Sequence, residues 1–295
     1  MASIPISTQP TNQSRDFWIT PCEQMLRLSR PLVKNCLVKG GRDDGLRLPP
    51  YVISKIALEF FKLSDQLPRG PHSLPSNFTN WYTALKRIDA LPDKIPALPL
   101  NIHEILRSAC PIFSTDKTLR TIGETHSLYL IPPGTLNELE QRVSRYGQQF
   151  FQGENPLKFR YFWNEARQEH GDIPVDEPRW VLITNDVLLG SRNQPYERQA
   201  QMITDLNERN STNYQVPTLR ETVLSLFLER IATGTSLYQE GNEQNGNQYT
   251  YTRVAETTRD WHLIVGGFAP SGLRVYYFGY DYAAGSDGMA ALRKF

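Results

Sequence analysis

Cys110, His126 and Asp186 are the residues whose types could together form a nucleophilic catalytic site. A thiol needs a neighbouring imidazole to become a thiolate, and the imidazole needs an acceptor that orients it. Asp186, at the end of the clearest predicted strand, offers that acceptor. One hypothesis is therefore a cysteine-dependent hydrolase or transferase. The alternative is structural, because cysteine is among the most buried residue types and a lone histidine is usually a hydrogen-bonded core or surface group.

A second candidate site is an aromatic cluster late in the sequence. Its members are Tyr276, Tyr277, Tyr280 and Tyr282. Aromatic strands can stack nucleic-acid bases, but such sites also need cations, and only Arg274 and residues 293–294 are close in sequence. Tyrosine combines apolar area with a polar tip, so the cluster favours a protein contact or the packing of a sheet face.

Motifs for cofactors and metals are missing from the sequence. The spacing of Gly266, Gly267 and Gly272 matches neither a dinucleotide fingerprint nor a phosphate-binding loop, and close packing in a β-hairpin explains these glycines better. His103 is followed by Glu104, but Arg107 stands where a zinc protease has its second histidine. We therefore predict no cofactor and no metal.

The elements that must position these residues predict an α+β fold, with a mixed and mainly antiparallel sheet and packed helices. Residues 180–183 form a nearly continuous apolar run, which is typical of a strand buried on both faces. Helices are predicted at 101–109, 135–150 and 157–169, and two more follow the central strand, the second from Pro217 to Gly234. Strands are predicted at 125–131, 179–188, 249–256, 261–268, 273–278 and 289–295.

The region before this domain has a different composition. Residues 1–20 are predicted to be a flexible N-terminus and residues 21–92 a small helical region, with helices at 51–67 and 77–88. Prolines are dense between 66 and 100, and they place a proline-rich linker at 93–100. The α+β domain is then expected over residues 101–295.

The charges of the 295-residue chain nearly cancel, at +1 overall. Residues 1–100 carry 13 basic and 8 acidic residues, a net charge of +5. Residues 101–295 carry 19 basic and 23 acidic residues, a net charge of −4. This balance gives no nucleic-acid signal. The basic stretch 24–42 could contact anionic membrane or an acidic partner, although a solvated face explains it as well. No apolar run approaches the length of a transmembrane helix.

The first residues of the sequence give information about where in the cell the protein is sent. Ten of residues 2–14 are Ser, Thr, Asn, Gln or Pro, and no apolar core of a secretory signal is present. Either this is a frayed terminus or it is an address for a needle-type bacterial secretion system. The three Cys are far apart, which predicts a reducing compartment.

Several ordered segments resemble an uncharacterised protein family of chlamydia-like intracellular bacteria. They are residues 102–106, 110–113, 124–126, 180–187, 190–192, 251–253, 264–269, 272–273 and 292–295. The likeness covers about residues 95–295. Some members of that family also carry leucine-rich repeats or F-box-like segments, which this chain lacks. The resemblance implies a protein that acts in an intracellular bacterium or in its host, and it implies no particular activity.

These observations favour a non-enzymatic protein, either a protein-interaction module or a host-directed effector, with a protein partner. The cysteine-dependent enzyme that uses Cys110, His126 and Asp186 remains the alternative.

Overall fold

The computed structural model describes residues 80–99, 101–114, 118–151, 155–238, 249–269, 271–279 and 282–295. The chain divides into two units, Met1–Pro71 and His72–Phe295, and all described residues belong to the second. The predictions for the flexible residues 1–20, the basic stretch 24–42 and the helix at 51–67 lie outside the described residues.

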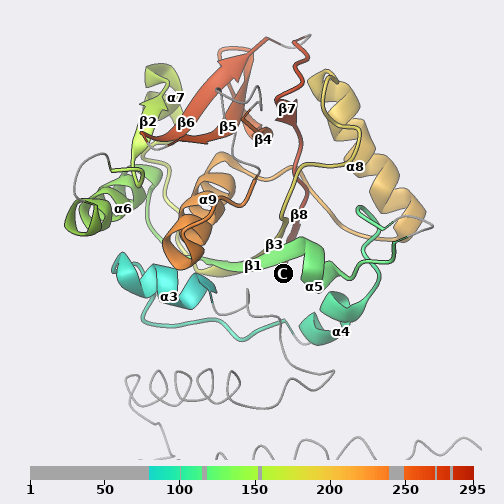
Figure 1. Ribbon diagram of the computed structural model, residues 1–295, viewed down its shortest axis with the longest axis horizontal. Coiled ribbons are helices and arrows are strands. Elements are labelled where there is room, and N and C mark those ends of the chain that lie inside the picture. Colours follow the sequence, from blue (N-terminus) through green and yellow to red (C-terminus); the bar gives the residue numbers. More distant parts are fainter. Residues whose placement is uncertain are drawn as a thin grey trace, which may run out of the picture. The chain divides into compact units, whose positions relative to one another are not determined.

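Two sheets organise the described part of the chain (Figure 1). The first has the order β1-β3-β8 and is antiparallel throughout. The second has the order β2-β6-β5-β4-β7, in which β2 pairs parallel with β6 and β4 pairs parallel with β7. The strands are β1 (His126–Ile131), β2 (Phe159–Phe162), β3 (Arg179–Thr184), β4 (Tyr251–Thr258), β5 (Trp261–Ala269), β6 (Gly272–Phe278), β7 (Asp287–Gly288) and β8 (Leu292–Lys294). The α+β prediction is confirmed.

Helix α9 lies between the two sheets and contacts β1, β4 and β5 (Figure 1). Its side chains are buried without a break from Leu219 to Leu228, which is the pattern of a helix covered on all sides. The helices are α3 (Asn80–Arg87), α4 (Ile102–Arg107), α5 (Ile122–Thr125), α6 (Leu136–Phe150), α7 (Asn164–His170), α8 (Tyr196–Asn210) and α9 (Leu219–Thr233). Among the described residues, no helix is long and apolar enough to cross a membrane.

Local chemistry explains where the long helices begin and end. Thr135 and Glu138 form a capping box at the start of α6, as the sequence predicts, and Thr218 and Glu221 form another at α9. Gly234 ends α9 with a φ of +76°, a left-handed conformation that favours glycine. Each end thus satisfies backbone groups that a helix would otherwise leave unpaired.

The predicted helix at 157–169 is wrong, because this segment begins as strand β2 and only then becomes α7. Phe159 and Phe162 are buried, and the two residues between them are exposed. The spacing of the two phenylalanines is compatible with one helical face, so the sequence pattern alone favoured a helix. The segment forms a strand because it pairs with β6. The pairing continues one residue past β2, where the Trp163 N–H donates to the Val275 carbonyl at 3.2 Å.

Helix α3 packs on α9 and β1. The Trp81 ring meets the Trp180 ring edge to face, with centroids 4.7 Å apart. The Trp180 indole N–H in turn donates to the Pro96 carbonyl at 3.1 Å, within the segment predicted as a proline-rich linker. Residues 80–99 therefore form part of the packing of the three-stranded sheet.

Candidate functional site

Cys110 lies in the loop after α4 and is completely buried, with an exposed fraction of 0%. Its sulfur accepts a hydrogen bond from the Phe113 backbone N–H at 3.4 Å, and its own N–H donates to the Arg120 carbonyl at 2.7 Å. A nucleophile must be reached by its substrate. This position matches the structural reading of Cys110, in which the thiol packs as a small apolar group.

His126 begins β1 and is also fully buried. Its Nδ1 lies 2.9 Å from Thr125 Oγ1, and its Nε2 lies 3.1 Å from Tyr214 Oη. The Thr125 hydroxyl donates to the Thr121 carbonyl, so it accepts from Nδ1–H, which leaves Nε2 to accept from the Tyr214 hydroxyl. This arrangement holds a neutral imidazole. Burial lowers the pKa of His126 to about 3, against a small opposing effect of the Ile122 carbonyl.

Asp186 follows β3 and points to solvent, with 53% of its side chain exposed. Its Oδ1 accepts from the Val187 N–H at 2.8 Å and lies 3.9 Å from the Arg192 guanidinium. Both ring nitrogens of His126 are already paired with Thr125 and Tyr214. The structure thus brings Cys110 and His126 into the same core region around Tyr214, but it does not place Asp186 as the orienting acceptor.

Aromatic rings gather around the end of β6. Tyr276 stacks on Tyr277 with ring centroids 4.8 Å apart and contacts Phe278, which stacks on Tyr282 at 4.0 Å. Tyr280 lies outside the described residues. The predicted cluster at 276, 277 and 282 is therefore one chain of ring contacts, continued through Phe278.

Sequence reasoning missed the rings that neighbouring strands bring to this cluster. Tyr161 of β2 lies 5.4 Å from Tyr276, while Trp163 and Trp261 lie 3.9 Å and 5.2 Å from Tyr277. The available signal in the sequence is the density of aromatic residues at 159–163, where four of the five residues are aromatic. Four rings of this group are exposed, and we call them the aromatic surface: Tyr161, Trp261, Tyr276 and Tyr282, at 43%, 42%, 37% and 44%.

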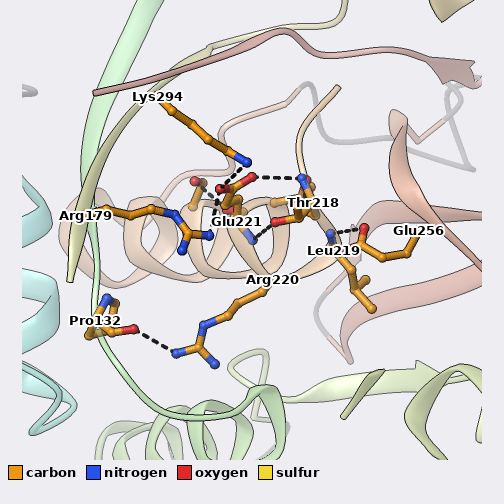
Figure 2. Close-up of polar contacts among 10 residues, drawn as sticks. Pro132, Arg179, Thr218, Leu219, Arg220, Glu221, Glu256 and Lys294 are labelled. Atoms are coloured by element: carbon orange, nitrogen blue, oxygen red, sulfur yellow. Dashed lines mark hydrogen bonds and ion pairs between the residues drawn. The ribbon is translucent and has the colours of Figure 1, made fainter. Parts of the chain in front are cut away.

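A buried ionic cluster lies on the other side of α9, against the three-stranded sheet. Figure 2 shows Arg179 of β3 and Lys294 of β8 both directed at the carboxylate of Glu221, which is fully buried. The distances are 3.0 Å to Arg179 Nη2 and 3.4 Å to Lys294 Nζ, and the Thr218 N–H donates to the same carboxylate at 2.9 Å. Burial alone raises the pKa of Glu221, but the Thr218 N–H, Lys294 and Arg179 outweigh it, so this pKa is lowered.

Glu256 joins the same helix start from β4. Its carboxylate accepts from the Leu219 N–H at 2.7 Å (Figure 2). Burial raises the pKa of Glu256, partly offset by that hydrogen bond. Two carboxylates therefore cap the N-terminal turn of α9, where the helix dipole favours negative charge. This cluster fixes the start of α9 to both sheets, and within the described residues its one buried atom without a hydrogen-bond partner is Arg179 Nε.

Among the described residues, no group of three or more His, Cys, Asp or Glu side chains is arranged to hold a metal ion.

Comparisons of the chain with protein-family models, with curated proteins and with solved structures give no match. The likeness to a family of chlamydia-like bacteria therefore stays a prediction from the sequence.

Proposed function

We propose that this chain is a protein-binding module whose contact surface is the aromatic surface of the five-stranded sheet. The observation that carries the proposal is the set of four exposed rings, from β2, β5, β6 and the segment after β6, which Tyr277 and Phe278 join into one chain of contacts. Large exposed apolar groups that lie together are characteristic of interaction sites, whereas single ones are ordinary.

The geometry suits a binding surface because the rings are held in place before any partner arrives. Tyr276 is fixed between Tyr161 and Tyr277, and Tyr282 is stacked on Phe278. Side chains that are already immobile lose little conformational entropy on binding. Tyrosine and tryptophan are also the residue types that most often dominate the energy of protein interfaces.

The surrounding charges favour a protein over a nucleic acid. Arg274 is half-buried and hydrogen-bonded to Tyr251, and Arg259 is paired with Glu165 at 3.6 Å. Lys158 and Arg160 are exposed cations close to Tyr161 in sequence, and Arg259 is exposed as well. A groove for single-stranded nucleic acid combines its aromatic rings with a continuous track of cations.

The test is a binding measurement with single substitutions in the full chain. Photo-crosslinking from position 276 identifies the partner, and Trp261→Ser and Tyr276→Ser are each expected to weaken its binding about tenfold or more. Phe295→Ser is the matched control, because that ring is 39% exposed on the other sheet. Equal binding by all variants would contradict the proposal, and so would crosslinks that disappear after ribonuclease treatment.

The geometry gives less support to the cysteine-dependent enzyme, because Cys110 is sealed and Asp186 faces away. Delivery into a host cell stays a prediction from the polar residues 2–14, and a secretion reporter fused to residues 1–30 tests it directly. Retention of that reporter inside the bacterium would remove the host-directed part of the function and leave the binding surface unaffected.

A further inference from the structure

A pocket of about 390 Å³ opens beside the start of α6. Its walls come from residues 89–94, from the turn at Pro132 and Pro133, from the first turns of α6, from Pro178 and from Arg220 of α9. The volume is in the range of small-ligand sites, and proline rings supply much of the apolar wall. Of the cations in its lining, Arg220 is the buried one, and Lys94 and Arg142 are exposed.

Arg220 is 8% exposed, yet most of its donors are unused. Its Nη2 donates to the Pro132 carbonyl at 2.9 Å, while within the described part of the chain Nε and Nη1 have no hydrogen-bond partner. Figure 2 shows the guanidinium turned away from Glu221 and towards Pro132. The neighbouring acid does not supply the missing acceptor, because the Glu138 carboxylate is held in the capping box by the Thr135 N–H at 2.8 Å.

An arginine buried in this way is costly without a partner. Each buried donor that lacks an acceptor forgoes the solvation it had in water. Burial, together with the nearby charge of Arg179, lowers the pKa of Arg220 to about 10, and Glu138 opposes this only in part. A ligand with acceptor oxygens would therefore stabilise the structure by pairing with the Arg220 guanidinium.

We propose that this pocket binds a small monocarboxylate, with a carboxylate oxygen accepting from the Arg220 guanidinium and the apolar part of the ligand against the proline walls. Charge decides between a carboxylate and a phosphate. Three cations line the pocket, Lys94, Arg142 and Arg220, and three acids balance them, Asp89, Asp93 and Glu138. These charges cancel, so the lining gives no net attraction to a second negative charge, and a doubly charged phosphate loses more solvation on entry than a singly charged carboxylate.

Benzoate is the probe, because it joins one carboxylate to a flat apolar body. Titration of the wild-type chain is expected to shift the NMR signals of Arg220 Nε–H and of the Leu139 methyl groups together, with a single dissociation constant. Inorganic phosphate at matched ionic strength is expected to bind about tenfold more weakly. Shifts spread over surface residues that spare Arg220 would overturn the proposal, and tighter binding of phosphate would overturn the choice of ligand.

Variants locate the site independently of that titration. Arg220→Gln and Arg220→Lys are expected to weaken benzoate binding about tenfold or more, since a hydrogen bond to a charged group is lost or misplaced. Arg145→Gln is the control, because it makes the same change of charge at an exposed position of α6. Unchanged affinity in the Arg220 variants would refute the site. If they fail to fold, the wild-type titration decides.

Discussion

Lowering the pH from 7 to 4 is expected to cost about 3 kcal/mol of unfolding free energy through His126 alone. The cause is the burial that lowers the pKa of this imidazole from 6.5 to about 3. In the unfolded chain His126 takes up a proton as the pH falls through 6.5, whereas the folded chain resists it until about pH 3. The stabilisation is therefore complete above pH 6.5 and is lost between that pH and about 3.

Urea denaturation across this pH range measures the effect as a difference between the wild type and His126→Gln, which does not titrate. Tyr214→Phe separates the effect of the Tyr214 hydrogen bond on stability from the effect of burial on the pKa of His126. It removes the hydroxyl that donates to Nε2, so it should lower stability at pH 7 by about 1–3 kcal/mol. It should keep most of the pH dependence, because burial is the main cause of the shift. A His126 imidazole signal that titrates near pH 6.5 in the folded protein would contradict the prediction.

Glu221→Gln is expected to reduce the unfolding free energy at pH 7 by about 3 kcal/mol. The substitution keeps the size of the side chain but leaves Arg179 and Lys294 without their counter-charge, and breaking a buried ion pair on one side typically costs about 3–5 kcal/mol. Arg179 and Lys294 are each about one-third exposed, so solvent relieves part of their loss and the low end of that range applies.

The pH dependence of this loss is distinct from that of His126. The pKa of Glu221 is lowered from 4.5, so its contribution is complete above pH 4.5 and disappears as the pH falls through the folded value. The wild type and Glu221→Gln should thus converge in stability as the pH falls below 4.5 and through the folded pKa of Glu221. Glu165→Gln is the control, since its ion pair with the largely exposed Arg259 should be worth less than about 1 kcal/mol. Equal losses of unfolding free energy in Glu221→Gln and Glu165→Gln would show that the buried cluster contributes no more stability than an exposed ion pair.

The parts of the fold that could be predicted from the sequence depend on neighbouring residues. Thr135 and Glu138 specify a helix start within one turn, and the apolar run at 180–183 specifies a buried strand. The division into two sheets depends on contacts between distant segments. Nothing local to residues 157–163 says that they will pair with β6, and the pairing of β3 with β8 rather than a hairpin partner has no short-range signal.

In the candidate sites, too, residues that are close in sequence could be predicted, and contacts between distant segments could not. Tyr276, Tyr277 and Tyr282 are close in sequence and could be found there, whereas Tyr161 and Trp261 join them only when β2 and β5 flank β6. One hydrogen-bond partner of His126 is Tyr214, which is 88 residues away, and it occupies the ring nitrogen that a catalytic base would need. The residue type of Asp186 and its place after a predicted strand suggest an acceptor, but neither determines that its side chain faces solvent.

The three-stranded sheet also has a kinetic consequence. Its central strand β3 is completed by β8, and the segments are joined by the bond from the Ala291 N–H to the Thr184 hydroxyl, which spans 107 residues. The entropy lost in closing a loop grows with its length, and chains dominated by distant pairings fold slowly. Until β8 docks, one edge of the apolar strand β3 stays unpaired. The ionic cluster around Glu221 forms at the same step, because Lys294 belongs to β8.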